Sequence, residues 1–421
     1  KPVVGPTVTN LTGMIVFTER GVQSTSLANA SGSSLNGPAA ATGNALQGIA
    51  YGNPVTITVN GGGDTGVTTE FTARADMAQL AEVLPFRLPQ QVSGTTEFHG
   101  KILARADTTE IVIDSNLAGV VSTLPYPLAK RANEPRLLRV QFVNVAQPVE
   151  QIHVTLAGNA SQPAAGAPMA APALAASVDQ PDTRIDARFQ RRFDAAGTPV
   201  ALLGGVATIG AAGDPAATMP ISEGIWFTGR LKQFDLDLWR AAFEGFYASS
   251  TTAPLASTQA AKNESLVAGF DFKLGGLIAY GRQFKGMTLK GRHGAEDWRF
   301  VVDSPEASGD VTWRPGAFND RGSVRARLTN FVLVDEAINP ASISAAADQN
   351  KALKNAEFPA LDIVAEQFTL KDRWMGKLEL RANPQGAQGA NWKIDQLTIS
   401  NGHVRLDMDG IWQHAAEPER L

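Results

Sequence analysis

The dominant pattern along this chain is an alternation of apolar and polar residues with a period of two. The segment 55–59 places Val55, Ile57 and Val59 on one side and two threonines on the other. Successive side chains of a β-strand point to opposite faces, so the segment predicts a strand with one apolar and one wetted face. Roughly twenty segments share this pattern and are joined by turn residues, which predicts an all-β, mainly antiparallel fold.

Helical patterns are scarce and short. Residues Asp76–Leu84 carry an Asp in the N-cap position and apolar residues at helical spacing, and Pro85 follows. Residues Asp237–Tyr247 carry an aromatic stripe, and residues 341–355 are a third candidate. These helices are too few for the strand–helix alternation of a parallel α/β sheet.

Three stretches interrupt the strand pattern: Ser24–Ala45, Gly158–Pro181 and Ala248–Asn263, all rich in small residues or proline. Such composition is typical of loops and linkers. We therefore expect a first β-segment over residues 1–157, a linker or long loop over 158–182, and a second β-segment over 183–421, with one sheet continuous through both.

The motifs that resemble catalytic sites have simpler explanations. Residues Gly61–Gly66 (GGGDTG) satisfy a dinucleotide fingerprint, but a strand-like segment follows where that site needs a helix, so a hairpin turn is expected. Asp235 and Asp237, like Asp407 and Asp409, form i, i+2 carboxylate pairs that a glycosidase or calcium site could use, but alternating strands place polar residues at the same spacing. The sequence contains no G-x-S-x-G elbow.

Composition narrows the function further. The chain of 421 residues has no Cys and only five His, none at zinc-ligand spacing, so disulfides and thiolate zinc sites are excluded and a zinc site is not expected. The net charge of −4 gives no reason to expect nucleic acid as a partner. No apolar run reaches the length of a membrane-spanning helix. Because the sequence opens on Lys1 without Met or a signal peptide, we expect a fragment of a longer protein. We predict no enzymatic activity and no cofactor.

The apolar faces of so many strands must be covered or occupied. Either two sheets close into a sandwich, or one sheet curls into a trough whose apolar lining holds a ligand. The local turns and the scarcity of helices favour the trough, and a large exposed apolar surface indicates a binding partner such as acyl chains. The predicted lining residues are Val55, Ile57, Val59, Ile111, Ile113, Leu138, Val140, Phe142, Ile152, Val154, Leu156, Phe270, Phe272, Leu274, Trp298, Phe300, Val302, Leu378, Leu380, Val404, Leu406 and Met408.

Three long segments resemble a known family. The block Ile111–Pro135 (IVIDSNLAGVVSTLPYPLAKRANEP) is similar to the strand-to-proline block of YhdP-type proteins, a branch of the AsmA-like family of Gram-negative bacteria. The segments Phe284–Trp313 and Phe358–Trp412 resemble later parts of the same proteins in the same order, and the opening Gly5–Val22 also fits.

The resemblance implies a periplasmic protein anchored in the inner membrane, with an elongated β-groove that carries phospholipid between inner and outer membrane and supports the outer-membrane barrier. It implies no catalytic residues. Two alternatives stay open from the residues alone: a structural β-protein with a closed sandwich core, and a glycan-binding or glycan-cleaving β-protein that would use exposed tryptophans. Lys130 and Arg131, which follow the proline block, are expected on a solvated surface, where they could also meet a phosphate head group.

Overall fold

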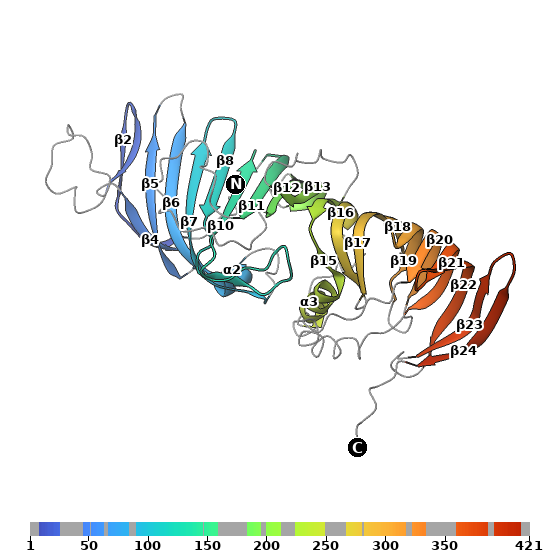
Figure 1. Ribbon diagram of the computed structural model, residues 1–421. Helices are drawn as coiled ribbons and strands as arrows, with labels where there is room; N and C mark the ends of the chain where they lie inside the picture. Colours follow the sequence, from blue (N-terminus) through green and yellow to red (C-terminus); the bar gives the residue numbers. More distant parts are fainter. Residues whose placement is uncertain are drawn as a thin grey trace, which may run out of the picture. The chain divides into compact units, whose positions relative to one another are not determined.

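The computed structural model describes residues 8–25, 45–50, 52–62, 66–83, 90–145, 147–158, 183–194, 199–211, 224–248, 267–279, 282–316, 322–333, 359–385 and 391–413 (Figure 1). Two helices lie within these residues, α2 (Met77–Val83) and α3 (Leu236–Ala248). The strands have the following bounds: β1 (Val8–Thr12), β2 (Met14–Thr18), β3 (Gly21–Thr25), β4 (Leu46–Ala50), β5 (Asn53–Gly61), β6 (Val67–Asp76), β7 (Val92–Ala104), β8 (Thr109–Ser115), β9 (Val120–Ser122), β10 (Arg136–Val143), β11 (Val149–Gly158), β12 (Thr183–Phe193), β13 (Pro199–Ala211), β14 (Ile225–Leu231), β15 (Phe234–Asp235), β16 (Val267–Ala279), β17 (Arg282–His293), β18 (Trp298–Asp303), β19 (Ala307–Arg314), β20 (Ser323–Leu333), β21 (Ala360–Leu370), β22 (Arg373–Gln385), β23 (Asn391–Ser400) and β24 (Arg405–Gln413).

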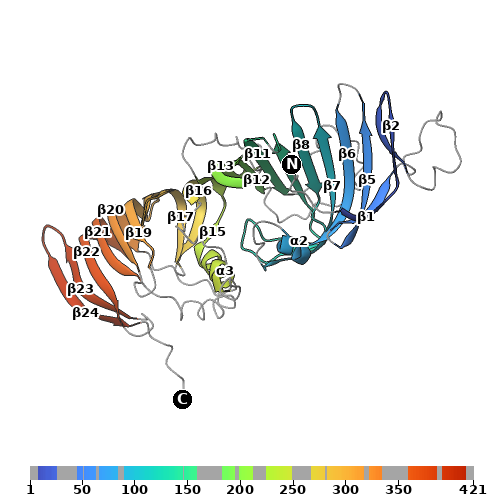
Figure 2. The ribbon, with the colours of Figure 1, turned by 180° about the vertical axis from the view of Figure 1, so that it is seen from behind.

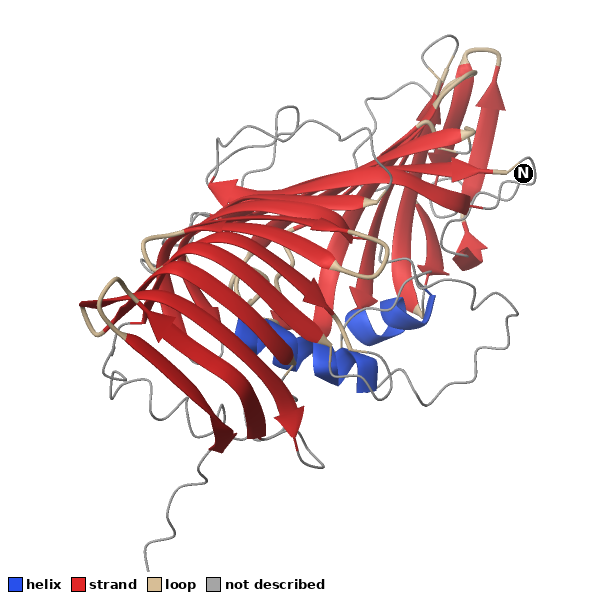
Figure 3. Cartoon of the chain, turned by 90° about the vertical axis from the view of Figure 1, so that its right-hand side faces the viewer, coloured by secondary structure: helices blue, strands red, loops and turns tan. Residues whose placement is uncertain are grey.

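The predicted fold class is confirmed: the chain is mainly antiparallel β, with strands that bend along their length so that the sheet curls (Figure 3). Both helices fall where the sequence predicts them. The Asp76 carboxylate accepts a hydrogen bond from the Ala78 amide at 2.8 Å, and Asp235 accepts one from the Leu238 amide at 2.9 Å. Each Asp thus satisfies a free amide at the start of its helix. The third candidate, residues 341–355, lies outside the described residues.

The chain divides into two compact units. Unit 1 comprises Lys1–Trp226 and Phe246–Ala253, and unit 2 comprises Phe227–Gly245 and Pro254–Leu421. The division falls within β14. Residues 159–182, in the predicted linker, lie outside the described residues. The strands on either side of them, β11 and β12, pair with each other from Val149 to Ala157 and from Arg184 to Arg192 within unit 1.

The sheet of unit 1 is an antiparallel ladder in which most neighbours are consecutive in sequence (Figure 1). Strand β5 pairs with β4 over one half and with β3 near its other end, and β6, β7 and β8 follow. Strand β8 then pairs with β10, because the short β9 turns back onto the first residues of β7. Strands β11, β12 and β13 complete the series.

The sheet of unit 2 runs from β16 to β24 in sequence order (Figure 2). All these neighbours are antiparallel except β20 and β21, which run parallel. Irregularities in register occur after Leu328 in β20 and after Ala365 in β21. Because both strands gain an extra residue at the same level, Phe331 and Phe368 return to the face that Leu328 and Ala365 occupy.

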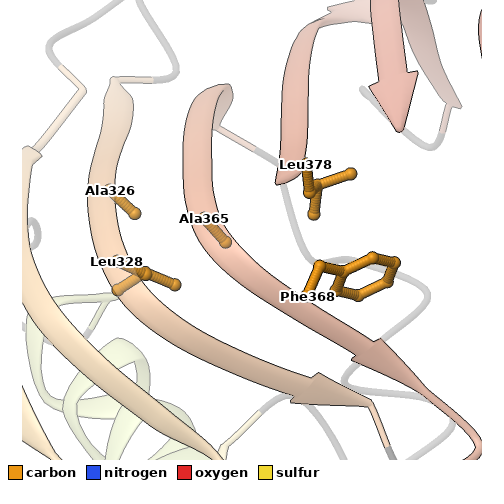
Figure 4. Packing of buried hydrophobic residues seen from close by; sticks show 5 residues of the cluster. All are labelled: Ala326, Leu328, Ala365, Phe368 and Leu378. Carbon is orange, nitrogen blue, oxygen red and sulfur yellow. The ribbon is translucent and has the colours of Figure 1, made fainter. Parts of the chain in front are cut away.

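A buried cluster anchors unit 2. Its members are Ala326, Leu328, Ala365, Phe368 and Leu378, and Ala365 is fully buried. Figure 4 shows their side chains pointing to the inside of the curve of their strands. The rings of Phe331 and Phe368 stack with centroids 5.9 Å apart. The apolar face of these strands is therefore the concave one.

The proline block of unit 1 folds into a compact segment after β8. Tyr126–Pro127 is a cis peptide, and the backbones of Ser122 and Lys130 exchange two hydrogen bonds. The expectation of a solvated Lys130 is wrong: its side chain is buried, and Nζ donates to the carbonyls of Val120 at 2.8 Å and Arg131 at 3.1 Å. Burial lowers the pKa of Lys130 from its usual value. Arg131, in contrast, is exposed.

Candidate functional site

The register of unit 1 aligns apolar residues from strand to strand. Directly paired residues share a face, so the pairing defines rows across the sheet. One row crosses eight strands from β5 to β13 and consists of Ile57, Phe71, Gly100, Ile113, Val140, Val154, Ala187 and Ala207. No residue of this row is polar.

Unit 2 repeats the arrangement on its own strands. A row crosses nine strands from β16 to β24 and consists of Phe272, Leu289, Val302, Gly309, Leu328, Ala365, Leu378, Ile399 and Leu406. We call the side of each sheet that carries these rows its apolar face.

The structure places the predicted lining residues on these faces, with one exception. In unit 1 they alternate along β5, β8, β10 and β11, and in unit 2 along β16, β18, β22 and β24. Val404 instead lies in the turn before β24, where its carbonyl accepts a hydrogen bond from the Asn401 amide, and it is 63% exposed. Its sequence continues the alternation of β24, but the strand begins only at Arg405.

Partial burial distinguishes this face from a sandwich core. Of the predicted lining residues, Val55, Leu274 and Leu378 are buried, whereas Leu406 and Met408 on β24 are exposed and most of the others are half-buried. A second sheet packed against the face would bury such side chains almost completely. Within the described part of the chain, the apolar faces therefore keep accessible surface, as an apolar binding surface requires.

The opposite face is polar and carries most of the ion pairs. Arg139 forms a bidentate ion pair with Asp114, with N···O distances of 2.7 and 3.0 Å. Arg327 donates a hydrogen bond to the Asp362 carboxylate at 2.7 Å. His153, Arg184 and Arg188 all lie within 3.4 Å of the Asp186 carboxylate. The Arg139–Asp114 and Arg327–Asp362 pairs are partly exposed, and such pairs contribute about 0–1 kcal/mol each, whereas Asp186 is buried beneath its three basic partners.

The pKa shifts on the polar face follow from these pairs. The Arg327 hydrogen bond lowers the pKa of Asp362 below its usual value, against a smaller effect of burial. Burial would raise the pKa of Asp186, but the hydrogen bonds from His153 and Arg184 and the charge of Arg188 together lower it. Carboxylates held ionised by cations are suited to structural pairing and not to general acid catalysis at neutral pH.

Phenylalanine rings lie flat across glycines on the apolar face. A Cβ built on Gly100 would meet the Phe71 ring at 1.9 Å, one on Gly205 the Phe189 ring at 2.5 Å, and one on Gly291 the Phe270 ring at 2.2 Å. In each pair the ring belongs to the neighbouring strand at the same level. The glycines therefore let large rings lie along the sheet instead of projecting from it. The rings thus occupy little of the space in front of the apolar face.

Comparison with known proteins agrees with this geometry. The model of the YhdP protein family matches residues 3–420. The chain belongs to the YhdP family. No curated protein and no solved structure matches it significantly. The family therefore covers both units and the proline block that carried the resemblance.

The other chemical motifs of this YhdP-family chain have structural roles. Gly61 ends β5, the Gly62 amide donates a hydrogen bond to the Gly66 carbonyl, and β5 pairs antiparallel with β6, so the two strands form a hairpin whose turn begins and ends with these glycines. Residues 63–65 lie outside the described residues. Asp235 caps α3, and Asp407 pairs with Arg405 and accepts a hydrogen bond from Thr398. The described residues contain no cluster of His, Asp or Glu that could hold a metal ion. In the same residues, no helix is long and apolar enough to cross a membrane.

Three charged residues on the apolar face of unit 1 were not singled out from the sequence. Arg136 lies at one end of the face, and Glu150 and Arg191 lie at the other. The sequence did contain a signal for them. Each lies two residues from an apolar residue of the same strand, namely Leu138, Ile152 and Phe189, and therefore on the same face. Among the described strands of unit 1, no other charged residue lies on this face.

Substituting Gly291 should show that the flat ring on the apolar face matters for stability. In Gly291→Ala the new methyl displaces the Phe270 ring, and we expect a loss of about 1–3 kcal/mol in the free energy of unfolding, measured by urea denaturation. Adding Phe270→Leu should recover much of it. Gly402→Ala is the control, because nothing lies within 4 Å of its Cβ position. Equal stability of Gly291→Ala and wild type would contradict the role of the ring.

Proposed function

We propose that this chain is a periplasmic segment of a lipid-transfer protein of the YhdP family. Its apolar faces shield the acyl chains of phospholipids as these move between the inner and outer membranes, and this transfer supports the outer-membrane barrier. The partners are phospholipid and, through other parts of the whole protein, the two membranes. The chain acts without catalysis and without a cofactor.

The observation that carries the proposal is the continuity of the apolar rows. Eight strands of unit 1 and nine of unit 2 each contribute an apolar residue or glycine at the same level, while the neighbouring levels of the ladder are mainly polar. Large accessible apolar surface on a soluble chain indicates a binding partner. A row without polar groups offers no hydrogen bond to a sugar or a nucleotide, but it suits a hydrocarbon chain. The envelope location rests on family membership.

The test is native mass spectrometry of the purified chain. We expect it to carry mass adducts that organic extraction identifies as phospholipid. Purified chain free of lipid, which also fails to extract lipid from vesicles, would reject the proposal.

Glycan binding is a second candidate that one observation favours. Trp298 and Trp313 lie directly opposite each other on β18 and β19, and Trp313 is 40% exposed. Aromatic side chains of this kind can stack on sugar rings. Trp298, however, also stacks on Phe270 and Phe300, with ring centroids 5.7 and 6.2 Å away, so it belongs to an aromatic cluster on the apolar face. Glycan in place of lipid in the extract would favour this candidate.

A further inference from the structure

An ion pair interrupts the apolar face of unit 1 at one end of β11 and β12. Glu150 is paired in register with Arg191, two positions beyond the apolar pair of Ile152 and Phe189. Both side chains thus project on the apolar face. Because Val149 begins β11 and Phe193 ends β12, the pair lies at the rim of the sheet.

The two members of the pair differ in exposure. The Glu150 side chain is 2% exposed, and it accepts a hydrogen bond from Nε of Arg191. The Arg191 side chain is 29% exposed, and its guanidinium carbon lies 4.9 Å from the centre of the Phe193 ring. Glu150 and Phe193 therefore hold the guanidinium in place, whereas part of the Arg191 side chain reaches the surface.

The terminal nitrogens of Arg191 are the chemically available groups. Within the described residues, Nη1 and Nη2 of Arg191 donate no hydrogen bond, since Nε alone meets Glu150. A guanidinium presents its donors in a planar fork that matches two oxygens of a phosphate. Arg136, at the other end of the face, differs: its side chain is buried, Nε meets Glu134, and Nη1 donates to the Pro127 carbonyl at 2.8 Å.

The apolar face beyond Arg191 has the length of a lipid tail. Phe189, Ala187 and Ile185 follow Arg191 at alternate positions of β12, with Ile152, Val154 and Leu156 opposite them on β11. Six residues of strand span about 20 Å, which is comparable with an extended acyl chain. The rim thus presents a partly exposed guanidinium whose partner carboxylate is buried, and an uncharged apolar stripe follows it. This arrangement complements the phosphate and the acyl chain of a phospholipid.

We propose that Arg191 binds the phosphate of a phospholipid whose acyl chains lie along β11 and β12. Glu150 is a positioning residue that orients the guanidinium, and Phe193 supports it from one side. The inference rests on the proposed lipid-transfer function and adds a recognition site for the phosphate group to it.

The experiment compares two lipids that share their acyl chains, a fluorescent phosphatidylglycerol and the matching diacylglycerol, each presented in micelles of an uncharged detergent that contains no phosphate. Wild type should bind the phosphatidylglycerol at least about tenfold more tightly, as charge-assisted hydrogen bonds to one phosphate provide. The double variant Glu150→Gln with Arg191→Gln should lose this preference and still bind diacylglycerol. Both residues are changed together because Arg191→Gln alone would leave Glu150 buried and unpaired.

Two further variants make the result specific. Arg192→Gln removes the same charge from the adjacent, exposed position on the polar face, and it should keep the preference. Arg191→Lys keeps the charge but not the fork, so its preference should be intermediate. A preference that survives in the double variant, or loss of both lipids together, would overturn the site.

The outcomes also separate this site from the function on which it rests. If wild type binds neither lipid, lipid transfer itself fails. If wild type binds both lipids equally, lipid binding stands and the phosphate site fails. The last control is competition with inorganic phosphate. At millimolar concentration, inorganic phosphate should not displace the bound phosphatidylglycerol. Displacement by phosphate in wild type would assign Arg191 to a free phosphate ion instead of a lipid.

Discussion

Replacing Val140 with aspartate should reduce lipid capture by unit 1 more than tenfold. Val140 lies in the middle of the apolar row, between Ile113 and Val154 on the neighbouring strands, and it is half-buried. A carboxylate there must either lose its hydration against the acyl chain or hold water within the row, and both outcomes oppose lipid binding. The measurement is photo-crosslinking of lipid to the chain, with crosslinked lipid quantified by mass spectrometry.

The matched control for this prediction is Gln141→Asp. Gln141 is the next residue of β10 and projects on the polar face, opposite His153. Gln141→Asp also places an aspartate, which strands disfavour, in β10. The comparison therefore separates a direct effect on lipid binding from a general loss of sheet stability. We expect Gln141→Asp to capture lipid as wild type does. Undiminished capture by Val140→Asp would show that this row does not contact lipid.

Truncating Phe368 to alanine should have the largest effect on stability. Phe368 is 4% exposed, stacks on Phe331, and belongs to the cluster that joins β20, β21 and β22. Removing a buried phenyl ring costs about 3–5 kcal/mol, from lost burial and from the cavity left behind. We expect a loss of this size in the free energy of unfolding of unit 2, measured by urea denaturation.

Trp374→Ala provides the comparison for Phe368. Trp374 lies in the hairpin of the same two strands, β21 and β22, and is 62% exposed, so its truncation should change the free energy of unfolding by less than about 1 kcal/mol. If both variants lose the same stability, the ring of Phe368 is not part of a packed core, and the cluster does not anchor the sheet.

Most of the fold could be predicted from local sequence pattern. The period-two alternation identified strands such as β5, β10 and β18, because a side chain's face depends only on its position along its own strand. The cap at Asp76 could be placed for the same reason, since an N-cap bonds to an amide two or three residues away. The cap at Asp235 was missed, because the second helix was predicted to begin at Asp237. The beginning of β24 could not, and Val404 was assigned to the strand although the turn extends to it.

Pairing between strands was beyond local pattern. The sequence does not state that β8 pairs with β10 instead of β9, or that β20 and β21 run parallel, because these choices depend on contacts between distant residues. The register irregularities that bring Phe331 and Phe368 to one face are also set by partner strands. Lys130 shows the same limit. Two prolines followed by a lysine predict a loop with a solvated lysine, whereas the burial of the Lys130 ammonium depends on carbonyls that only the folded segment brings to it.

The sequence by itself determined the fold class, the family, and which residues of each strand share an apolar side. The fold class and the apolar sides follow from composition and spacing, which act within a few residues. The family follows from the similarity of long segments to known members. Tertiary structure alone decided that the apolar sides align into rows, that glycines let phenylalanine rings lie flat beside them, and that Glu150 and Arg191 meet at the rim. Each depends on register between strands, and register is fixed by the sum of many cross-strand contacts that no single segment contains.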